Sequence, residues 1–348
     1  MYEPDTDATT RSEPANAWAT IADVAQLAGT STSSASRALS GRGYVSSALR
    51  QRIMDAAKEL NYIANEPARA LKGVPQSVIG VVVTDLRDSF YADLTSGVMS
   101  ATRAKPVIPI VLELGRNESP ESLVTKLVSM RIGGAVITPN SPQLGLRLTD
   151  SRVPVVEVDR RFSRGRSDGV VVDNISAGLT VMKHLVRYGH RRIALVVDEL
   201  EWSTGRDRLS AYRQSLAENQ LPDRTDWVIE VSPEDHTGVA RRMRQLMEGD
   251  SPPTAIIAAN SSTAESVLRA ARQIDLRIPD DVSLAAFDDA PWMTLTSPMI
   301  TTINQHPQLL GRMAVELLLR RIAEPDAPFQ TIVADAELIE RGSVVAPR

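Results

Sequence analysis

Residues 20–41 read TIADVAQLAGTSTSSASRALSG and predict two short helices joined by a tight turn. Thr20 is a good helix N-cap, and Asp23 follows it at the spacing of a capping box. The first helix then carries one apolar stripe at helical spacing, formed by Ile21, Val24, Ala25 and Ala28. Gly29 ends this helix, because glycine adopts the left-handed conformation of a tight turn without steric penalty.

Two further helices are expected after this turn. Ser31 caps a helix over 32–39, and Gly41 stops it. Ser46 caps a third helix, whose apolar stripe consists of Leu49, Ile53, Ala56, Ala57 and Leu60. The small residues Ala25, Gly29 and Ala35 stand at the spacing that lets the first two helices of a helix-turn-helix cross closely. Taken alone, the segment is also compatible with another small three-helix bundle.

The second helix presents a polar outer face that suits a nucleic acid. Its outward residues are Thr32, Ser33, Ser36 and Arg37. An arginine on a helix in the major groove can donate two hydrogen bonds to guanine, and hydroxyl groups suit phosphates or base edges. The alternative for Arg37 is an ordinary solvated base on the surface.

The charge distribution supports a nucleic-acid partner for this segment. The whole chain has 39 basic and 43 acidic residues, a net charge of −4. Residues 19–72 carry seven bases and four acids, whereas residues 73–348 carry 31 bases and 35 acids. Residues 1–18 carry four acids and one base without apolar periodicity, and we expect a disordered acidic tail there. Positive charge gathered at one end is a stronger signal than the total.

Beyond a linker at 73–77, GVPQS, the pattern changes to an alternation of strands and helices. Continuous β-branched runs predict strands that are buried on both faces, at 78–83, 107–112, 135–137, 155–158, 193–197, 255–258 and 284–287. Helices are expected between them near 90–104, 119–130, 174–188, 205–219, 237–248, 261–273 and 307–323. This alternation predicts parallel α/β sheets. About seven such units exceed what one core comfortably holds, which favours two subdomains.

Composition argues against several classes of function. The chain has no cysteine, which excludes disulfides, thiol catalysis and cysteine-bound metals. Its four histidines, at 184, 190, 236 and 306, lack metal-ligand spacing, and the sequence contains no phosphate-binding glycine loop or nucleophile elbow. We therefore expect no catalytic residue, no metal and no cofactor. The sequence also lacks an apolar run long enough for a bilayer and a secretory signal, so we expect a cytoplasmic protein without a membrane partner.

The ordered set of motifs resembles the lactose-repressor (LacI/GalR) family of bacterial transcription regulators. In the N-terminal segment the resemblance rests on residues 20–31, 34–41, 45–46, 60–62, 65, 68–69 and 71–72. In the rest of the chain it rests on 79–81, 158–161, 172–174, 189–194, 258–260, 286–289, 297–298, 301–302 and 341–343. The resemblance implies an all-α helix-turn-helix headpiece and an α/β core with two Rossmann-like lobes of the periplasmic-binding-protein type.

By position, the resemblance divides the chain into five parts. They are a tail at 1–18, the headpiece at 19–63, a hinge helix and linker at 64–76, the core at 77–343, and a tail at 344–348. In the core, the chain should cross three times between lobes. The first lobe is expected at about 77–172 and 305–330, and the second at about 173–304 and 331–343.

The resemblance also implies roles on DNA. Thr32, Ser33 and Arg37 would contact bases, whereas Thr20, Ser31 and Ser36 would contact phosphates. In the hinge, Ala68, Leu71 and Lys72 would enter the minor groove, with Leu71 wedged between base steps. So short a helix is unstable alone and should form only when two copies pack on DNA. A proline-marked linker fits the hinge composition equally well.

Polar residues at the ends of predicted strands indicate a ligand cleft. Ligands of open α/β sheets bind at the carboxyl ends of the strands, where this sequence places Asp85, Asp159, Asn260 and Asp288. The same residue types also cap helices. The resemblance favours ligand contact for Asp159, Asn260 and Asp288, and it adds Phe90, Arg208 and His236.

These side chains suit a sugar or sugar derivative, because carboxylates and a guanidinium bind hydroxyl groups and an aromatic ring covers a sugar face. A nucleobase or nucleoside is the alternative, and a sugar-binding protein without a DNA role is a remote one. The resemblance implies a homodimer that binds a palindromic operator with an affinity set by this effector. One branch of the family that the sequence resembles forms tetramers through C-terminal leucine heptads. The sequence contains no such heptads, so the resemblance implies a dimer.

Overall fold

The protein is represented by a computed structural model that describes residues 19–41, 43–62, 78–115, 118–163, 165–198, 200–231 and 236–348. The chain divides after Pro75 into two compact units, the headpiece and the core, which are described separately. The expected acidic tail at 1–18 and the expected hinge at 64–76 lie outside the described residues. Within the described ranges, no helix is both long and apolar enough to cross a bilayer.

The headpiece contains helices α1 (Ile21–Leu27), α2 (Thr32–Ser40) and α3 (Ser47–Glu59). The predicted capping box is present at the start of α1, and Gly29 and Gly41 both adopt left-handed conformations. Small and branched side chains fill the centre of the unit, with Val24, Ala35 and Ile53 fully buried. The headpiece therefore folds around a small core that leaves the outer face of α2 exposed.

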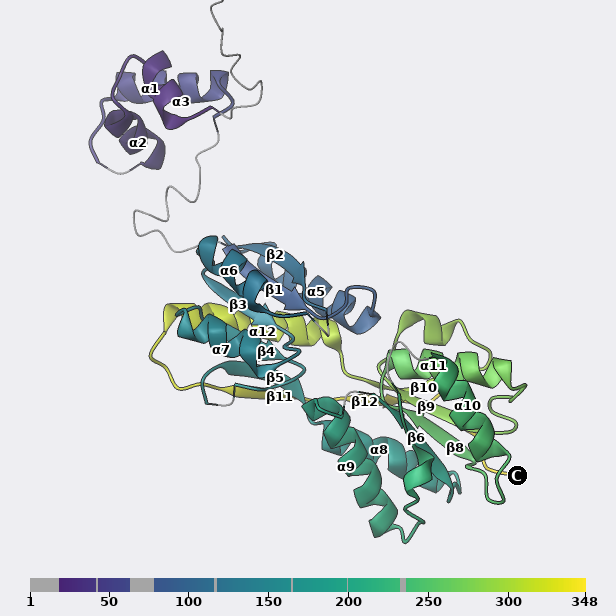
Figure 1. The fold of residues 1–348 in the computed structure, drawn as a ribbon. Coiled ribbons are helices and arrows are strands. Elements are labelled where there is room, and N and C mark those ends of the chain that lie inside the picture. Colours follow the sequence, from purple (N-terminus) through teal and green to yellow (C-terminus); the bar gives the residue numbers. More distant parts are fainter. Residues whose placement is uncertain are drawn as a thin grey trace, which may run out of the picture. The chain divides into compact units, whose positions relative to one another are not determined.

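The first lobe of the core is built on a parallel sheet of strand order β11-β5-β4-β3-β1-β2. Its strands are β1 (Val78–Val83), β2 (Ile108–Glu113), β3 (Gly134–Ile137), β4 (Val155–Val158), β5 (Asp168–Val172) and β11 (Thr331–Ala334). Helices α5 (Ser89–Thr102) and α12 (Pro307–Ala323) pack on one face, and α6 (Glu121–Ser129) and α7 (Pro142–Asp150) pack on the other. Figure 1 shows α12, near the end of the chain, lying with the first lobe.

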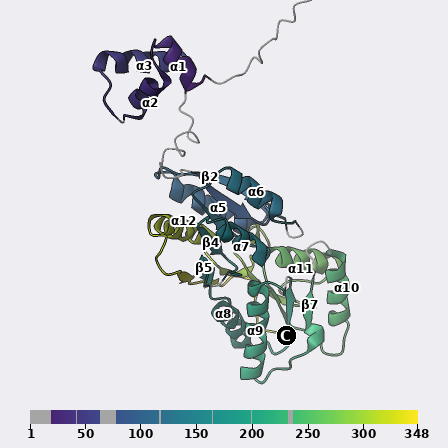
Figure 2. The same cartoon turned by 60° about the vertical axis from the view of Figure 1, so that its left-hand side comes forward.

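The second lobe repeats this plan with the strand order β12-β10-β9-β8-β6-β7. Its strands are β6 (Ile193–Val197), β7 (Val228–Glu230), β8 (Ala255–Ala258), β9 (Ser283–Phe287), β10 (Thr301–Asn304) and β12 (Glu337–Ile339). Helices α8 (Asn174–Arg187) and α9 (Ser203–Glu218) cover one face, and α10 (His236–Met247) and α11 (Ser261–Gln273) cover the other (Figure 2). Only β12 runs antiparallel to its described neighbour.

The two lobes exchange chain segments at three places, after β5, after β10 and after β11. The sequence-based boundary after residue 330 is wrong, because Thr331–Ala334 pair with Gly169–Val172 in the first sheet. This edge strand escaped prediction because it is short and partly exposed, with Val333 58% exposed. The expected tail at 344–348 also needs correction. Val344 is buried against the second lobe, and the Val345 N–H donates to Ser283 Oγ at 3.1 Å.

Helices α5 and α12 cross very closely on the first sheet. A Cβ atom added to Gly97 would lie 2.1 Å from the carbonyl oxygen of Gln308. On α12, a Cβ atom added to Gly311 would lie 2.2 Å from the carbonyl oxygen of Leu94. The absence of these side chains permits the close approach, which holds the first turns of both helices at the edge of the cleft described below.

Candidate functional site

The outer face of α2 carries the residues predicted to contact bases. Thr32, Ser33 and Arg37 are all exposed, and Ser36 is half-buried. The Arg37 Nε–H donates to the Ser33 carbonyl at 3.3 Å, so its guanidinium lies along the helix. These side chains form a polar surface that can donate and accept hydrogen bonds.

Two predicted phosphate contacts are helix caps. Ser31 Oγ accepts a hydrogen bond from Ser34 N–H at 3.2 Å at the start of α2. Thr20 donates from its backbone N–H and its hydroxyl to Asp23, at 2.7 Å in both cases. The backbone hydrogen bond from Thr20 lowers the pKa of Asp23 below its usual value. A negative charge therefore stands beside Thr20, whereas Ser31 has no such neighbour in its described hydrogen bonds.

A small polar cavity, here called the inner cavity, lies between the two lobes and has a volume of about 30 Å³. Five of the predicted effector residues line it: Phe90, Asp159, Arg208, Asn260 and Asp288. The structure also brings to it residues that the sequence analysis missed: Asp88, Tyr91, Asp198, Trp202, Thr204 and Gln305. Asp198 follows β6 directly, as Asp159 follows β4, so the same strand-end signal would have found it.

Two predicted residues are not placed at this cavity. Asp85 forms an ion pair with Arg87 at 2.8 Å and is absent from the described lining. The chain turns after β1 ends at Val83. Asp88, which follows Asp85 by three residues, lines the cavity instead. His236 begins α10, but its side chain lies outside the described part of the structure.

Strand ends position the acidic groups from both lobes. Asp159 follows β4 and Asp288 follows β9, with φ angles of +69° and +67°. Few residue types other than glycine adopt this conformation, although aspartate tolerates it better than most. Such strained positions often occur at functional sites. The two carboxylates thus occupy equivalent places in the two lobes.

A hydrogen-bonded network holds the acids in place. Asp288 accepts from Ser261 N–H at 3.0 Å and from Gln305 Nε2 at 2.5 Å. Asn260 caps α11 through its oxygen and donates from Nδ2 to Asp198 at 2.8 Å, so it is a cap as well as a lining residue. Arg208 donates from Nε to Asn174 at 2.8 Å and from Nη1 to the Ala259 carbonyl.

Burial disfavours the charged forms of three aspartates that line the inner cavity. Burial raises the pKa of Asp159 and of Asp288, although arginine neighbours oppose the effect. Burial, followed by the charge of Asp288, raises the pKa of Asp88 to about 6. A ligand that donates hydrogen bonds to these carboxylates would therefore stabilise their charged form.

Among the described residues, three contacts join the lobes directly across the cleft, and we call this set the latch. The Trp202 ring stacks on the Arg160 guanidinium, with 3.6 Å between the ring centroid and Cζ. Trp202 Nε1 also donates to the Asn140 carbonyl at 3.2 Å. The third contact is a 3.1 Å hydrogen bond from Ser261 Oγ to Asp88. The latch closes the lobes over the inner cavity.

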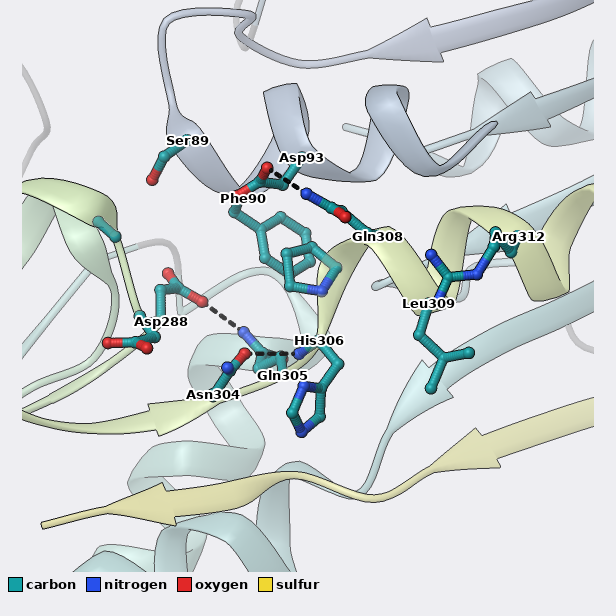
Figure 3. A pocket seen from close by; sticks show the side chains of 13 residues that line it. Ser89, Phe90, Asp93, Asp288, Asn304, Gln305, His306, Gln308, Leu309 and Arg312 are labelled. Carbon is teal, nitrogen blue, oxygen red and sulfur yellow. Dashed lines mark hydrogen bonds between the residues drawn. The ribbon is translucent and has the colours of Figure 1, made fainter. Parts of the chain in front are cut away.

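A larger chamber of about 320 Å³ adjoins the inner cavity, and we call it the outer chamber (Figure 3). The two spaces share Phe90, Asp288 and Gln305. The rest of the outer lining comes from the first turns of α5 and α12 and from strand ends: Ser89, Asp93, Asp289, Ala290, Asn304, His306, Pro307, Gln308, Leu309 and Arg312. Within the described residues, no cluster of His, Cys, Asp or Glu is suited to a metal ion.

The three-helix headpiece with its exposed polar helix, and the two-lobed core with a polar cleft, define a DNA-binding regulator that senses a small molecule. Residues 20–65 match the family described as "Bacterial regulatory proteins, lacI family", and residues 182–344 match the periplasmic binding protein-like domain. The chain belongs to the lacI family of bacterial regulatory proteins and is a DNA-binding transcriptional repressor.

Its relatives are repressors rather than enzymes. The chain is 30% identical to the "Ribose operon repressor" of Haemophilus influenzae, over 94% of this chain and 98% of that protein. It is also 30% identical to the "HTH-type transcriptional repressor PurR" of Erwinia tasmaniensis, over 94% and 97% of the two chains.

Solved structures share the fold across both units. A "transcriptional regulator CelR-cellobiose complex" is 26% identical, with a TM-score of 0.70, over 93% of this chain and 99% of that one. A lac repressor dimer bound to operator and the anti-inducer ONPF is 24% identical, with a TM-score of 0.79, over 94% and 99% of the chains.

Proposed function

We propose that this repressor binds a palindromic operator as a homodimer, and that a small sugar-like effector bound between the lobes controls its affinity for DNA. The observation that carries the effector proposal is the convergence of Asp88, Asp159, Asp198 and Asp288 on one cavity between the lobes. Arg208 is the single guanidinium in its described lining. A ligand rich in hydrogen-bond donors, such as a polyol, matches this excess of acceptors.

On the DNA side, α2 would be the recognition helix. Thr32, Ser33 and Arg37 would contact base edges, which is supported by their exposure on one helix. Ser31, Ser36 and Thr20 would contact phosphates, with Ser31 better placed than Thr20 because Asp23 adds negative charge beside Thr20. The minor-groove roles of Ala68, Leu71 and Lys72 rest on the sequence resemblance.

An exposed apolar edge of the first lobe supports the homodimer. Strand β2 is an edge strand, and its first residue, Ile108, is 54% exposed. Met99 on the neighbouring helix α5 is 44% exposed. Exposed edges that carry apolar side chains favour association with another chain, and a second copy would cover this one.

The closed latch suggests how an effector acts. The inner cavity holds about 30 Å³, whereas ligand pockets typically measure about 300–1,000 Å³. A sugar ring would therefore enter only when the lobes move apart and the latch breaks. Effector binding would shift the population toward a state with a different lobe angle. In a dimer, each headpiece would be linked to the first lobe of its own core, so a change in the lobe angle would change the spacing of the two headpieces.

A nucleobase or nucleoside is the second candidate effector. Phe90, Tyr91 and Trp202 line the inner cavity and could stack on a planar base. The relatives named PurR are similar over nearly the whole chain.

A thermal-shift screen of the full chain against sugars, sugar phosphates, nucleobases and nucleosides separates the candidates, because a ligand of the native state raises the melting temperature. Each ligand that binds is then added to a complex of the repressor with operator fragments selected from random DNA. We expect a sugar to stabilise the protein and to change operator affinity. Stabilisation by nucleobases alone would contradict the sugar proposal, and unchanged operator affinity would contradict the regulatory one.

A further inference from the structure

We propose that the outer chamber is a second compartment of the effector cleft, so that the effector has two units and is a disaccharide or a glycoside. This inference rests on the proposed sugar effector and specifies its size. One unit would occupy the inner cavity after the lobes part, and the other would occupy the outer chamber.

The two spaces adjoin, because three residues line both of them. Phe90, Asp288 and Gln305 line both of them, so a ligand held by Asp288 on one side is beside the chamber on the other. Figure 3 shows the Asp288–Gln305 pair and the Asp93–Gln308 pair on either side of the Phe90 ring. At about 320 Å³, the outer chamber falls within the usual size range of small-molecule sites, which begins at about 300 Å³.

Gln305 stands at the junction with an unused acceptor. Its Nε2 donates to Asp288, but its Oε1 is buried and has no hydrogen-bond partner among the described residues. The whole residue is only 2% exposed. Buried polar atoms in native proteins are nearly always satisfied, so an unpaired acceptor between the inner cavity and the outer chamber indicates a missing donor. A hydroxyl group near the bond between two sugar units would supply that donor.

The chemistry of the outer chamber fits a neutral hydroxylated ring. Phe90, Pro307 and Leu309 offer apolar surface for a sugar face, and Ser89, Asn304 and Gln308 offer polar groups for hydroxyls. The charges argue against an anionic group. Asp93 and Asp288 outnumber Arg312 in the lining, whereas the third acid, Asp289, is paired with Arg341 at 2.6 Å. The His306 imidazole lies 3.6 Å from the Glu337 carboxylate.

The test fills the outer chamber and leaves the inner cavity intact. Leu309 is 40% exposed at its rim, so Leu309→Trp places a large ring in the chamber without burying a new side chain in the core. Leu295→Trp is the matched control, because Leu295 is 85% exposed on the second lobe and outside the described lining. Calorimetry on the full chain uses glucose, galactose and ribose, and compares them with cellobiose, maltose, lactose and methyl glucosides.

We expect at least one disaccharide or glycoside to bind at least about tenfold more tightly than its component monosaccharide. Leu309→Trp should abolish that preference, and Leu295→Trp should retain it. The inference is overturned if a monosaccharide binds as tightly as its disaccharides, if the preference survives Leu309→Trp, or if none of the two-unit ligands binds. The same titrations include glucose 6-phosphate, and the inference is also overturned if this anion binds more tightly than every neutral sugar. A monosaccharide that binds as tightly as its disaccharides and alters operator affinity would contradict this inference and leave the proposed function standing.

Discussion

Trp202 of the second lobe lies stacked on Arg160 of the first, with its indole N–H bonded to the Asn140 carbonyl of the first lobe. Arg160 is fully buried and is held from its own lobe by Thr84 and Tyr91, which accept hydrogen bonds from Nη2 at 2.9 and 2.6 Å. The guanidinium is therefore a fixed platform on which Trp202 rests. The contact therefore joins the two lobes across the cleft.

Trp202→Leu should open the cleft, because it removes both the stacking and the indole hydrogen bond. The chain has no native cysteine, so spin labels can be placed at Met130→Cys and Leu295→Cys, one exposed site in each lobe. We expect a longer and broader distance distribution between the labels than in the parent. Tyr188→Leu is the control, because the Tyr188 ring contacts His184 within one lobe. An unchanged distribution in Trp202→Leu would show that the latch does not hold the lobes.

Effector affinity should weaken as the pH falls from 7 to 5. Burial raises the pKa of Asp88 to about 6, above its ordinary value of 3.8, so a proton is bound more tightly in the closed state. Opening would hydrate this carboxylate and lower its pKa, so protonation favours the closed state as the pH falls through about 6. Protonation also removes a charged acceptor for ligand hydroxyls. Calorimetry across this pH range should show the loss of effector affinity. The Asp88→Asn variant should show a weaker dependence of effector affinity on pH. A stronger affinity at pH 5 would refute the assignment.

Gly97→Ala should destabilise the core by about 1–3 kcal/mol, because overpacking at a helix crossing forces backbone shifts. The added methyl group would lie 2.1 Å from the Gln308 carbonyl oxygen, a contact that a flexible side chain cannot relieve. Thermal unfolding measures the effect. Gly249→Ala is the control, since its methyl group would meet its nearest atom at 3.5 Å. Equal melting temperatures for the two variants would mean that the α5–α12 crossing is looser than described.

The strands that could be predicted from the sequence are those whose own residues mark them as buried. β1, β6, β8 and β9 are continuous runs of small and branched apolar residues because helices cover both faces of each sheet. β11 and β12 are short strands at sheet edges with partly exposed side chains. Their partners come from far along the chain, so no local pattern marks them.

The same distinction holds in the cleft. Asp159 and Asp288 could be predicted because each follows a buried strand, and strands in a parallel sheet end at the same edge. Trp202 lies in the loop between β6 and α9. Gln305 lies between β10 and α12, where the chain crosses from one lobe to the other. Their positions depend on how two separate sheets meet, which the local sequence does not encode. The misplacement of Asp85 has a related cause, because the turn after β1 decides which aspartate faces the cleft.

Arg37→Ala should weaken operator binding by about 1–3 kcal/mol and relax the preference at one base pair, as expected for a bidentate contact to guanine. Lys58→Ala is the control, because Lys58 is an exposed base on α3, and its loss changes charge without removing a contact from α2. Fluorescence anisotropy on operator variants distinguishes a general loss of affinity, caused by the lost charge, from a changed preference at one base pair. The base-reading role of Arg37 fails if the variant ranks operator sequences as the parent does.

The most direct test of the central claim, that the cleft controls DNA binding, is operator affinity with and without effector in Asp288→Asn. The substitution keeps the shape of the side chain and removes its charge, and it replaces with an NH2 group one of the two oxygens that accept from Ser261 and Gln305. We predict that the parent changes its operator affinity on adding effector. The variant should bind the operator as the parent does without effector, and should show no change when effector is added. A variant that responds to effector with parental affinity and amplitude would contradict the account.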